Sequence, residues 1–257
     1  MTARVTVWWK CYLSLSILFA FRAISSLSTF PIFRATYHWD RLDQGNLLSA
    51  EAWGCLLACF IGAFAVRTVG SKVVIIIAHL WQAYFSLFHT SMSFAYYDLW
   101  TNKFFSSMAD GIIFIAVFHT LLFWLPSNEL LSHFYLLSSA VGVGFISGIL
   151  IVWTCFMIAS WQLSFGFMVI LTAVAAYQWY SPSVSSYPCD NTKIPKTEQN
   201  YIQSNCYKVN RKGKGIYSNK QRYTDREEQN CADIGRICCG ILNLSGLLLV
   251  PFPMVML

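Results

Sequence analysis

The stretch KFFSSMADGIIFIAVFHTLLFWL, residues 103–125, decides the fold class of this chain because it is long and apolar enough to cross a bilayer. It nevertheless contains Lys103, Asp110 and His119, and an ionisable side chain at the bilayer centre costs at least about 2.5 kcal/mol. Lys103 and Asp110 are seven residues apart, which is two helical turns, so they share one helix face. Such a face can bind an anion and a proton. The alternative is a salt bridge at the membrane rim that only fixes packing, with Lys103 snorkelling to the headgroups.

The composition of the whole chain is that of a membrane protein. Apolar residues make up 56% of the 257 residues and charged residues only 12%, far from the values of soluble domains. Half of the Lys and Arg residues lie between positions 193 and 226, so the net charge of +6 mainly reflects this region and does not indicate nucleic-acid binding. The nine cysteines lack the paired spacing of a zinc site, and we expect neither a metal nor a cofactor.

Six apolar runs with short connectors predict an all-α, six-helix membrane bundle over residues 1–181. Each run approaches the roughly 20 residues that a spanning helix needs. Basic residues precede the first run, lie between the second and third, and follow the sixth, which predicts a cytoplasmic N-terminus and a cytoplasmic region after the bundle. The runs are 11–33, 47–66, 73–95, 104–125, 132–155 and 163–180.

Two further segments follow the predicted bundle. Residues 182–231 are polar and lack apolar periodicity, so we expect a basic cytoplasmic loop with little core of its own. Residues 232–257 include an uncharged apolar stretch, 237–257, which Pro251 and Pro253 interrupt. This last segment is either a seventh span or a non-native end.

A basic turn joins the second and third runs and reads Gly62-Ala-Phe-Ala-Val-Arg67-Thr-Val-Gly70-Ser-Lys72. Gly70 permits a tight turn between antiparallel helices, and Arg67 and Lys72 lie where they can dock on helix ends or acidic groups. The pattern resembles the cytoplasmic loop signature of the major facilitator superfamily, G-x-x-A-D-R-x-G-x-K. Val66 occupies the position of the family's Asp, which removes the acidic half of that inner-gate charge relay.

Other stretches resemble one branch of that superfamily, the organic anion group of sialin, the vesicular glutamate transporters and the sodium/phosphate cotransporters. Arg22 matches the first-span Arg of the group's R-x-N-L-S, Lys103 replaces a fourth-span Arg, and Asp110 followed by Gly replaces Glu-Gly. His119 follows with one extra residue before it. The resemblance covers about residues 11–205, the N-terminal half of a twelve-span carrier. Its remaining matches are 37–39, Gln44, Gly45, Leu48, Ser49, Trp53, Gly54, Pro126, Glu129, Ser147, Gly148, Trp161, Trp179 and 194–202.

The resemblance implies a secondary active transporter of organic anions or phosphate, coupled to protons or sodium, in the plasma membrane or in a lysosomal or vesicular membrane. Arg22 and Lys103 would bind the negative group of the substrate, and Asp110 and His119 would take part in proton coupling. Glu51 stands where the group is aromatic, and it either pairs with a basic group or faces the inside of the bundle. His79 and His89 have no counterpart in the group, and we expect them to be packed, hydrogen-bonded side chains.

The chain supplies only one of the two six-span halves between which such carriers close their cavity. We therefore expect a second copy or a complementary carrier half as a partner, besides the anion, the ion and membrane lipid. The alternative is a truncated membrane protein that does not transport and acts as a structural or regulatory partner. An enzyme is not expected, because no nucleophile with its base and no phosphate-binding glycine loop is recognisable.

Overall fold

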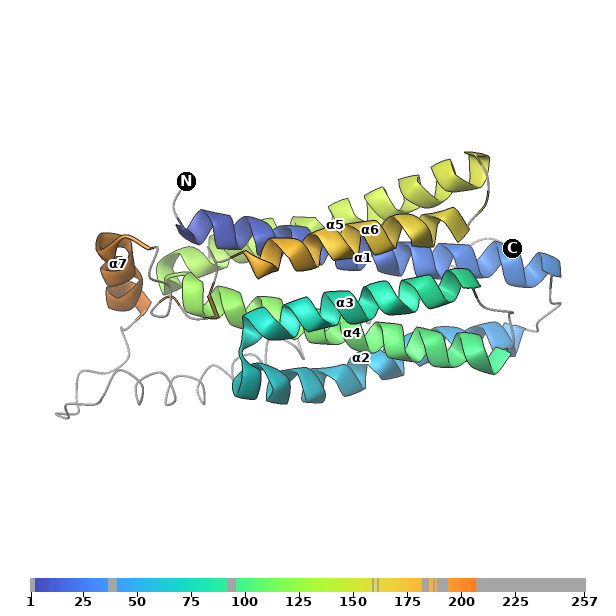
Figure 1. The fold of residues 1–257 in the computed structure, drawn as a ribbon, viewed down its shortest axis with the longest axis horizontal. Coiled ribbons are helices and arrows are strands. Elements are labelled where there is room, and N and C mark those ends of the chain that lie inside the picture. Colours follow the sequence, from blue (N-terminus) through green and yellow to red (C-terminus); the bar gives the residue numbers. More distant parts are fainter. Residues whose placement is uncertain are drawn as a thin grey trace. The chain divides into compact units, whose positions relative to one another are not determined.

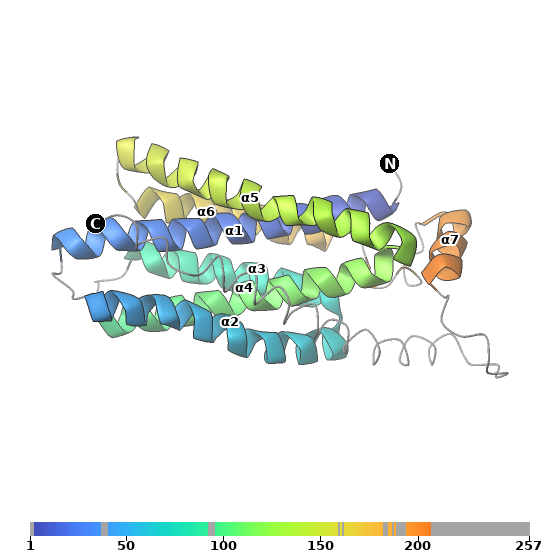
Figure 2. The same ribbon diagram turned by 180° about the vertical axis from the view of Figure 1, so that it is seen from behind.

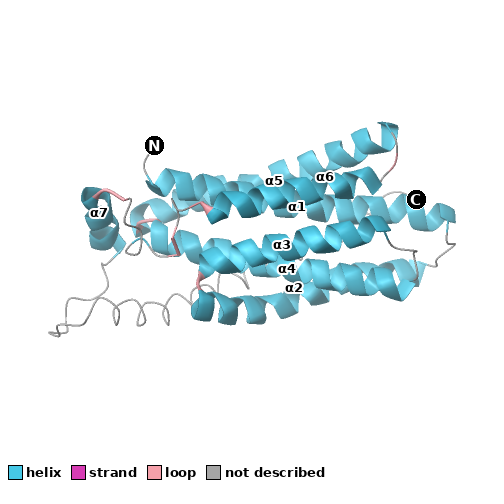
Figure 3. Ribbon diagram, in the orientation of Figure 1, coloured by secondary structure: helices cyan, strands magenta, loops and turns pink. Residues whose placement is uncertain are grey.

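The computed structural model consists of helices in the residues that it describes, which are 3–36, 41–91, 96–158, 160, 162–181, 185, 186, 188 and 194–206. None of these residues forms a β-strand (Figure 3). Six of the helices are long and apolar enough to cross a membrane, which confirms the predicted six-helix membrane bundle. The helices are α1 (Ala3–Thr36), α2 (Arg41–Val69), α3 (Ser71–Ser91), α4 (Tyr96–Trp124), α5 (Ser127–Ile158), α6 (Gln162–Tyr180) and the shorter α7 (Lys196–Cys206) (Figure 1).

Parts of the sequence-based predictions lie outside the described residues. These are most of the predicted loop 182–231, the whole of segment 232–257, residues 37–39 and Trp161. Within the loop, the structure has a helix, α7, that no apolar run in the sequence predicts.

Helix α4 lies at the centre of the bundle and contacts α1, α2 and α3. Helices α1 and α5 pack on each other, as do α3 and α6, and α2 packs along α4 (Figures 1 and 2). Most residues of α4 are therefore buried, including Lys103, Asp110 and His119. The charged residues of the stretch that predicted the fold thus lie inside the bundle.

Small residues allow the paired helices to approach closely. A Cβ added at Gly54 of α2 would lie 2.2 Å from the carbonyl oxygen of Phe104, and one added at Gly111 of α4 would lie 2.6 Å from Cβ of Ala58 on the same seam. Gly144 and Gly148 of α5 lie one helical turn apart against the backbone of α1. Since lipid tails are as apolar as a protein core, helices in a membrane gain from this close contact rather than from the hydrophobic effect.

The outward faces of the helices are apolar. Large exposed side chains include Phe60 and Phe64 on α2, Trp153 and Phe156 on α5, and Tyr177 on α6. An apolar exterior around buried charged groups is typical of a bundle whose solvent is lipid.

Candidate functional site

Three helices bring four charged side chains together inside the bundle. Arg22 comes from α1, Glu51 from α2, and Lys103 and Asp110 from α4. Lys103 is 0% exposed, Asp110 3% and Glu51 7%, and the side chain of Arg22 is 13% exposed. They form two ion pairs, Lys103 with Glu51 and Arg22 with Asp110. We refer to these four residues as the charge cluster.

The ammonium group of Lys103 is fully occupied by partners within the bundle. Its Nζ lies 2.5 Å from Oε1 of Glu51, 3.2 Å from Oγ of Ser25 and 3.4 Å from the carbonyl oxygen of Ser25. The hydroxyl of Ser25 also donates to Oε1 of Glu51 at 3.0 Å. An ammonium has three N–H donors, and three acceptors surround this one. Of the two alternatives left open for Glu51, the structure has the one in which it pairs with a basic group.

The second pair is looser. Nε of Arg22 lies 3.6 Å from Oδ2 of Asp110, which exceeds the usual hydrogen-bond distance. Gln82 of α3 donates from Nε2 to Oδ1 of Asp110 at 2.7 Å. Nη2 of Arg22 is buried and has no hydrogen-bond partner among the described residues. Cys55 and Glu51 of α2 are the other ionisable groups close to the guanidinium, and the side chain of Cys55 shares a hydrogen bond with Arg22.

The two pairs lie at different depths along α4. Asp110 is the midpoint of the helix Tyr96–Trp124, and Lys103 lies seven residues closer to its start. Seven residues correspond to about 10 Å of helical rise. The ammonium of Lys103 is held by α1 and α2 at this depth, and the side chain is fully buried.

His119 lies apart from the charge cluster. It follows Asp110 by nine residues, which at 100° per residue puts the two side chains on opposite sides of α4. Its buried ring packs on Phe123, with 4.7 Å between ring centroids. Arg67, near the end of α2, is a charged group that acts on it electrostatically. A role for His119 in proton coupling remains a prediction, and this position would separate that role from Asp110.

The predicted inner-gate residues divide between helix packing and the α2–α3 turn. A Cβ added at Gly62 would lie 3.3 Å from Cα of Ile112, so Gly62 belongs to the α2–α4 seam. Gly70 has φ of 92°, a left-handed conformation that ends α2, and its N–H donates to the carbonyl of Val66 at 3.0 Å. Arg67 is exposed.

Lys72 docks on the end of a helix of its own bundle. Its Nζ donates to the carbonyl of Ser181 at 3.0 Å, and its backbone N–H donates to Oγ of Ser186 at 3.2 Å. Lys10 of α1 reaches the same place, because its Nζ donates to the carbonyl of Gln178 at 2.7 Å. Cations at a helix C-terminus complement its dipole and its unpaired carbonyls, so the two lysines stabilise the end of α6.

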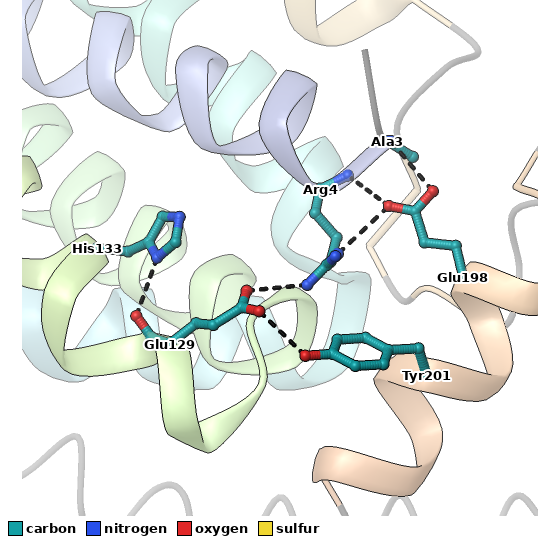
Figure 4. A network of polar contacts seen from close by, with 6 residues as sticks. All are labelled: Ala3, Arg4, Glu129, His133, Glu198 and Tyr201. Atoms are coloured by element: carbon teal, nitrogen blue, oxygen red, sulfur yellow. Dashed lines mark hydrogen bonds and ion pairs between the residues drawn. The ribbon is translucent and has the colours of Figure 1, made fainter.

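Helix α7 is fastened to α1 and α5 by a polar network that Figure 4 shows. Glu198 accepts hydrogen bonds from the backbone N–H groups of Ala3 and Arg4, each at 3.3 Å. The Arg4 guanidinium pairs with Glu198 at 3.4 Å and with Glu129 of α5 at 2.9 Å, and it stacks over the ring of Tyr201. Tyr201 in turn donates to Glu129 at 3.1 Å. In the sequence, Glu129 and residues 194–202 are separate matches, and no pattern there predicts that they meet each other and Arg4.

The two additional buried histidines are packed side chains. Nε2 of His79 lies 3.2 Å from Oγ of Ser14, which also accepts a hydrogen bond from Nε1 of Trp179 at 2.8 Å. This contact joins α1, α3 and α6. The ring of His89 packs on Phe165, with 4.6 Å between centroids.

Comparison with known proteins adds support at the level of the fold. No protein-family model matches the sequence, and no curated protein matches it. The structure resembles the crystal structure of a mutant of the peptide transporter POT in complex with sulfate, with a TM-score of 0.56 and 12% sequence identity. The match covers 98% of this chain and 47% of the transporter, so the chain spans about half its length. At 12% identity this likeness supports the fold of the helical bundle alone, and it does not extend to the organic anion group.

Proposed function

We propose that the chain is one half of a secondary active transporter that moves a small organic or inorganic anion together with a proton or a sodium ion. The observation that supports this proposal best is the loose Arg22–Asp110 pair at the midpoint of α4. Arg22 has a buried nitrogen, Nη2, with no acceptor in the part of the chain that the structure describes, and the carboxylate of Asp110 neutralises the charge of Arg22. The organic anion branch suggested by the sequence supplies the substrate class of this proposal.

The pair provides a physical basis for coupling. A buried guanidinium without a counter-charge is strongly destabilising, so Arg22 must keep an anion beside it. When Asp110 takes up a proton, it no longer neutralises Arg22, and a substrate anion can replace its charge. Loss of the proton restores the internal pair and expels the anion. Since each state keeps the site neutral, proton and anion move together.

A second half is part of the proposal. Alternating access requires two bundles that rock about a central site, and this chain contributes one bundle. A second copy or a complementary half would supply the other bundle, in the plasma membrane or in a lysosomal or vesicular membrane. Proteoliposomes that contain the chain at a density too low for pairing should show no uptake. Robust uptake there would indicate a self-sufficient transporter.

Anion binding tests the proposed function directly. Purified chain in nanodiscs should bind radiolabelled butyrate, more tightly as the pH falls over a range in which butyrate stays ionised. Arg22→Gln should abolish binding, and Asp110→Asn should remove its pH dependence. Circular dichroism and size-exclusion profiles establish that the variants are folded. If butyrate and phosphate both fail to bind in an Arg22-dependent manner, the transporter proposal is rejected in favour of the non-transporting partner.

A further inference from the structure

The carboxylate of Glu51 binds the ammonium group of Lys103, at the position where the carboxylate of an anionic substrate would bind. It lies on the ammonium at 2.5 Å, and Ser25 completes the coordination from α1. All three residues are buried, and each comes from a different helix. The bundle thus provides its own anion for this cation.

A substrate cannot take this place without a large penalty. It would have to separate Glu51 from Lys103, and Glu51 would then remain buried without its cation. Removing one partner from a buried pair is costly, because the other charge is left uncompensated. Lys103 has no free donor to offer alongside Glu51, since all three of its N–H groups have acceptors.

Arg22 differs from Lys103 on each of these points. Its contact with Asp110 is 3.6 Å long, and its Nη2 meets no acceptor in the described part of the chain. The four charges of the cluster sum to zero, with Arg22 and Lys103 positive and Glu51 and Asp110 negative. One proton on Asp110 leaves a single positive charge to be neutralised, which is the charge that one monoanion supplies.

We infer that Glu51 determines specificity: because its carboxylate permanently neutralises the charge of the Lys103 ammonium, it restricts the site at Arg22 to substrates with one negative charge, taken up with one proton. This inference rests on the proposed function and adds the substrate class, a monocarboxylate or another monoanion. Dianions are excluded because the cluster offers them only one open cation.

Two ligands of equal carbon chain length test the inference. Butyrate has one carboxylate and succinate has two, so the ratio of their dissociation constants reports the number of open cations. The intact chain in nanodiscs should prefer butyrate. Glu51→Gln frees Lys103 and should shift the ratio toward succinate by at least about tenfold, which corresponds to about 1.4 kcal/mol.

A paired variant guards against loss of folding. Glu51→Gln alone leaves Lys103 buried without a counter-charge, whereas Glu51→Gln/Lys103→Gln removes both charges and keeps two hydrogen-bonding side chains. The double variant should fold, bind butyrate like the unmodified chain and keep its preference over succinate. Loss of butyrate binding in the folded double variant would mean that Lys103 contacts the substrate, and it would overturn the inference.

A control and a reference measurement make the outcomes distinct. Asp98→Asn removes an exposed carboxylate from the first turn of α4 and should leave the ratio unchanged. If the intact chain binds butyrate through Arg22 but Glu51→Gln does not change the ratio, the inference about Glu51 fails and the proposed function stands. If neither ligand binds in an Arg22-dependent manner, both fail.

Discussion

Nε of Arg22 in α1 lies 3.6 Å from Oδ2 of Asp110 at the midpoint of α4, and Gln82 of α3 holds the other carboxylate oxygen at 2.7 Å. The carboxylate of Asp110 therefore links three helices, α1, α3 and α4. Asp110 is buried and the side chain of Arg22 is only 13% exposed, so the two members of the pair are coupled energetically whatever the chain transports.

This coupling predicts a non-additive effect on stability. Asp110→Leu should lower the free energy of unfolding by about 3–5 kcal/mol, because it leaves the guanidinium of Arg22 buried without a counter-charge. Arg22→Leu/Asp110→Leu should recover most of that loss. Unfolding in SDS, followed by circular dichroism for the single variants and the double variant, measures the cycle. Losses that simply add in the double variant would show that the two residues do not act as a pair.

The α2–α4 seam predicts a steric effect at Gly54. A Cβ at this position would lie 2.2 Å from the carbonyl oxygen of Phe104, and backbone atoms cannot yield without moving a helix. Gly54→Val should therefore destabilise the bundle by about 1–3 kcal/mol or more. Gly45 on the same helix has open space around it, so Gly45→Ala is the matched control and should stabilise α2 by up to about 1 kcal/mol. Equal stability of the two variants would contradict the observed helix contact.

The network around Arg4 predicts that the docking of α7 is electrostatic. Arg4→Gln removes the ion pairs to Glu129 and Glu198 and the contact with Tyr201. Each partly exposed pair contributes about 1 kcal/mol or less, so the variant should raise hydrogen exchange in residues 196–206 while the spans stay protected. High salt should have the same effect on the unmodified chain. Lys196→Gln, at an exposed position, is the control and should change nothing; an equal rise there would exclude a specific role for Arg4.

The arrangement of basic residues predicts the topology. The N-terminus and residues 182–231 should be cytoplasmic, and the hydrogen bonds from Ala3 and Arg4 to Glu198 require the start of α1 and α7 to share one side of the membrane. In sealed vesicles whose cytoplasmic face points outward, Thr197→Cys, which introduces an exposed thiol on α7, should react with a membrane-impermeant maleimide. Labelling only after these vesicles are opened would reverse the topology.

Local sequence patterns predict the six spanning helices because each contains a continuous apolar run, and such runs are visible without knowledge of the fold. The shared face of Lys103 and Asp110 follows from helical periodicity in the same way. The ion-pair partners of Lys103 and Asp110 do not follow from helical periodicity. Glu51 precedes Lys103 by 52 residues along the chain, and only the packing of α2 on α4 shows that they pair.

Helix α7 escapes prediction for a different reason. It is 11 residues long and polar on average, so neither a long apolar run nor an apolar period marks it. Its position depends on Glu198 and Tyr201, which meet Arg4 and Glu129 from distant parts of the chain. Buried Ile194 and Ile202 add apolar contacts, but two isoleucines in a polar stretch form no pattern.

The contact of Gln82 with Asp110 has only a weak signal in the sequence, which is a single Gln in the third apolar run.

Glu198 binds α1 through hydrogen bonds from backbone N–H groups. The N–H groups of Ala3 and Arg4 belong to the first turn of a helix, where no preceding carbonyl can accept them, and a carboxylate there also meets the positive end of the helix dipole. These two contacts are indifferent to the side chains at positions 3 and 4. They depend on the backbone that precedes them. An engineered N-terminal extension that lengthens α1 by one turn would provide carbonyl acceptors for these two N–H groups and displace the Glu198 carboxylate. A tag joined through a rigid helical linker would therefore release α7 from the start of α1, whereas the same tag joined through a glycine-rich linker would leave α7 bound there.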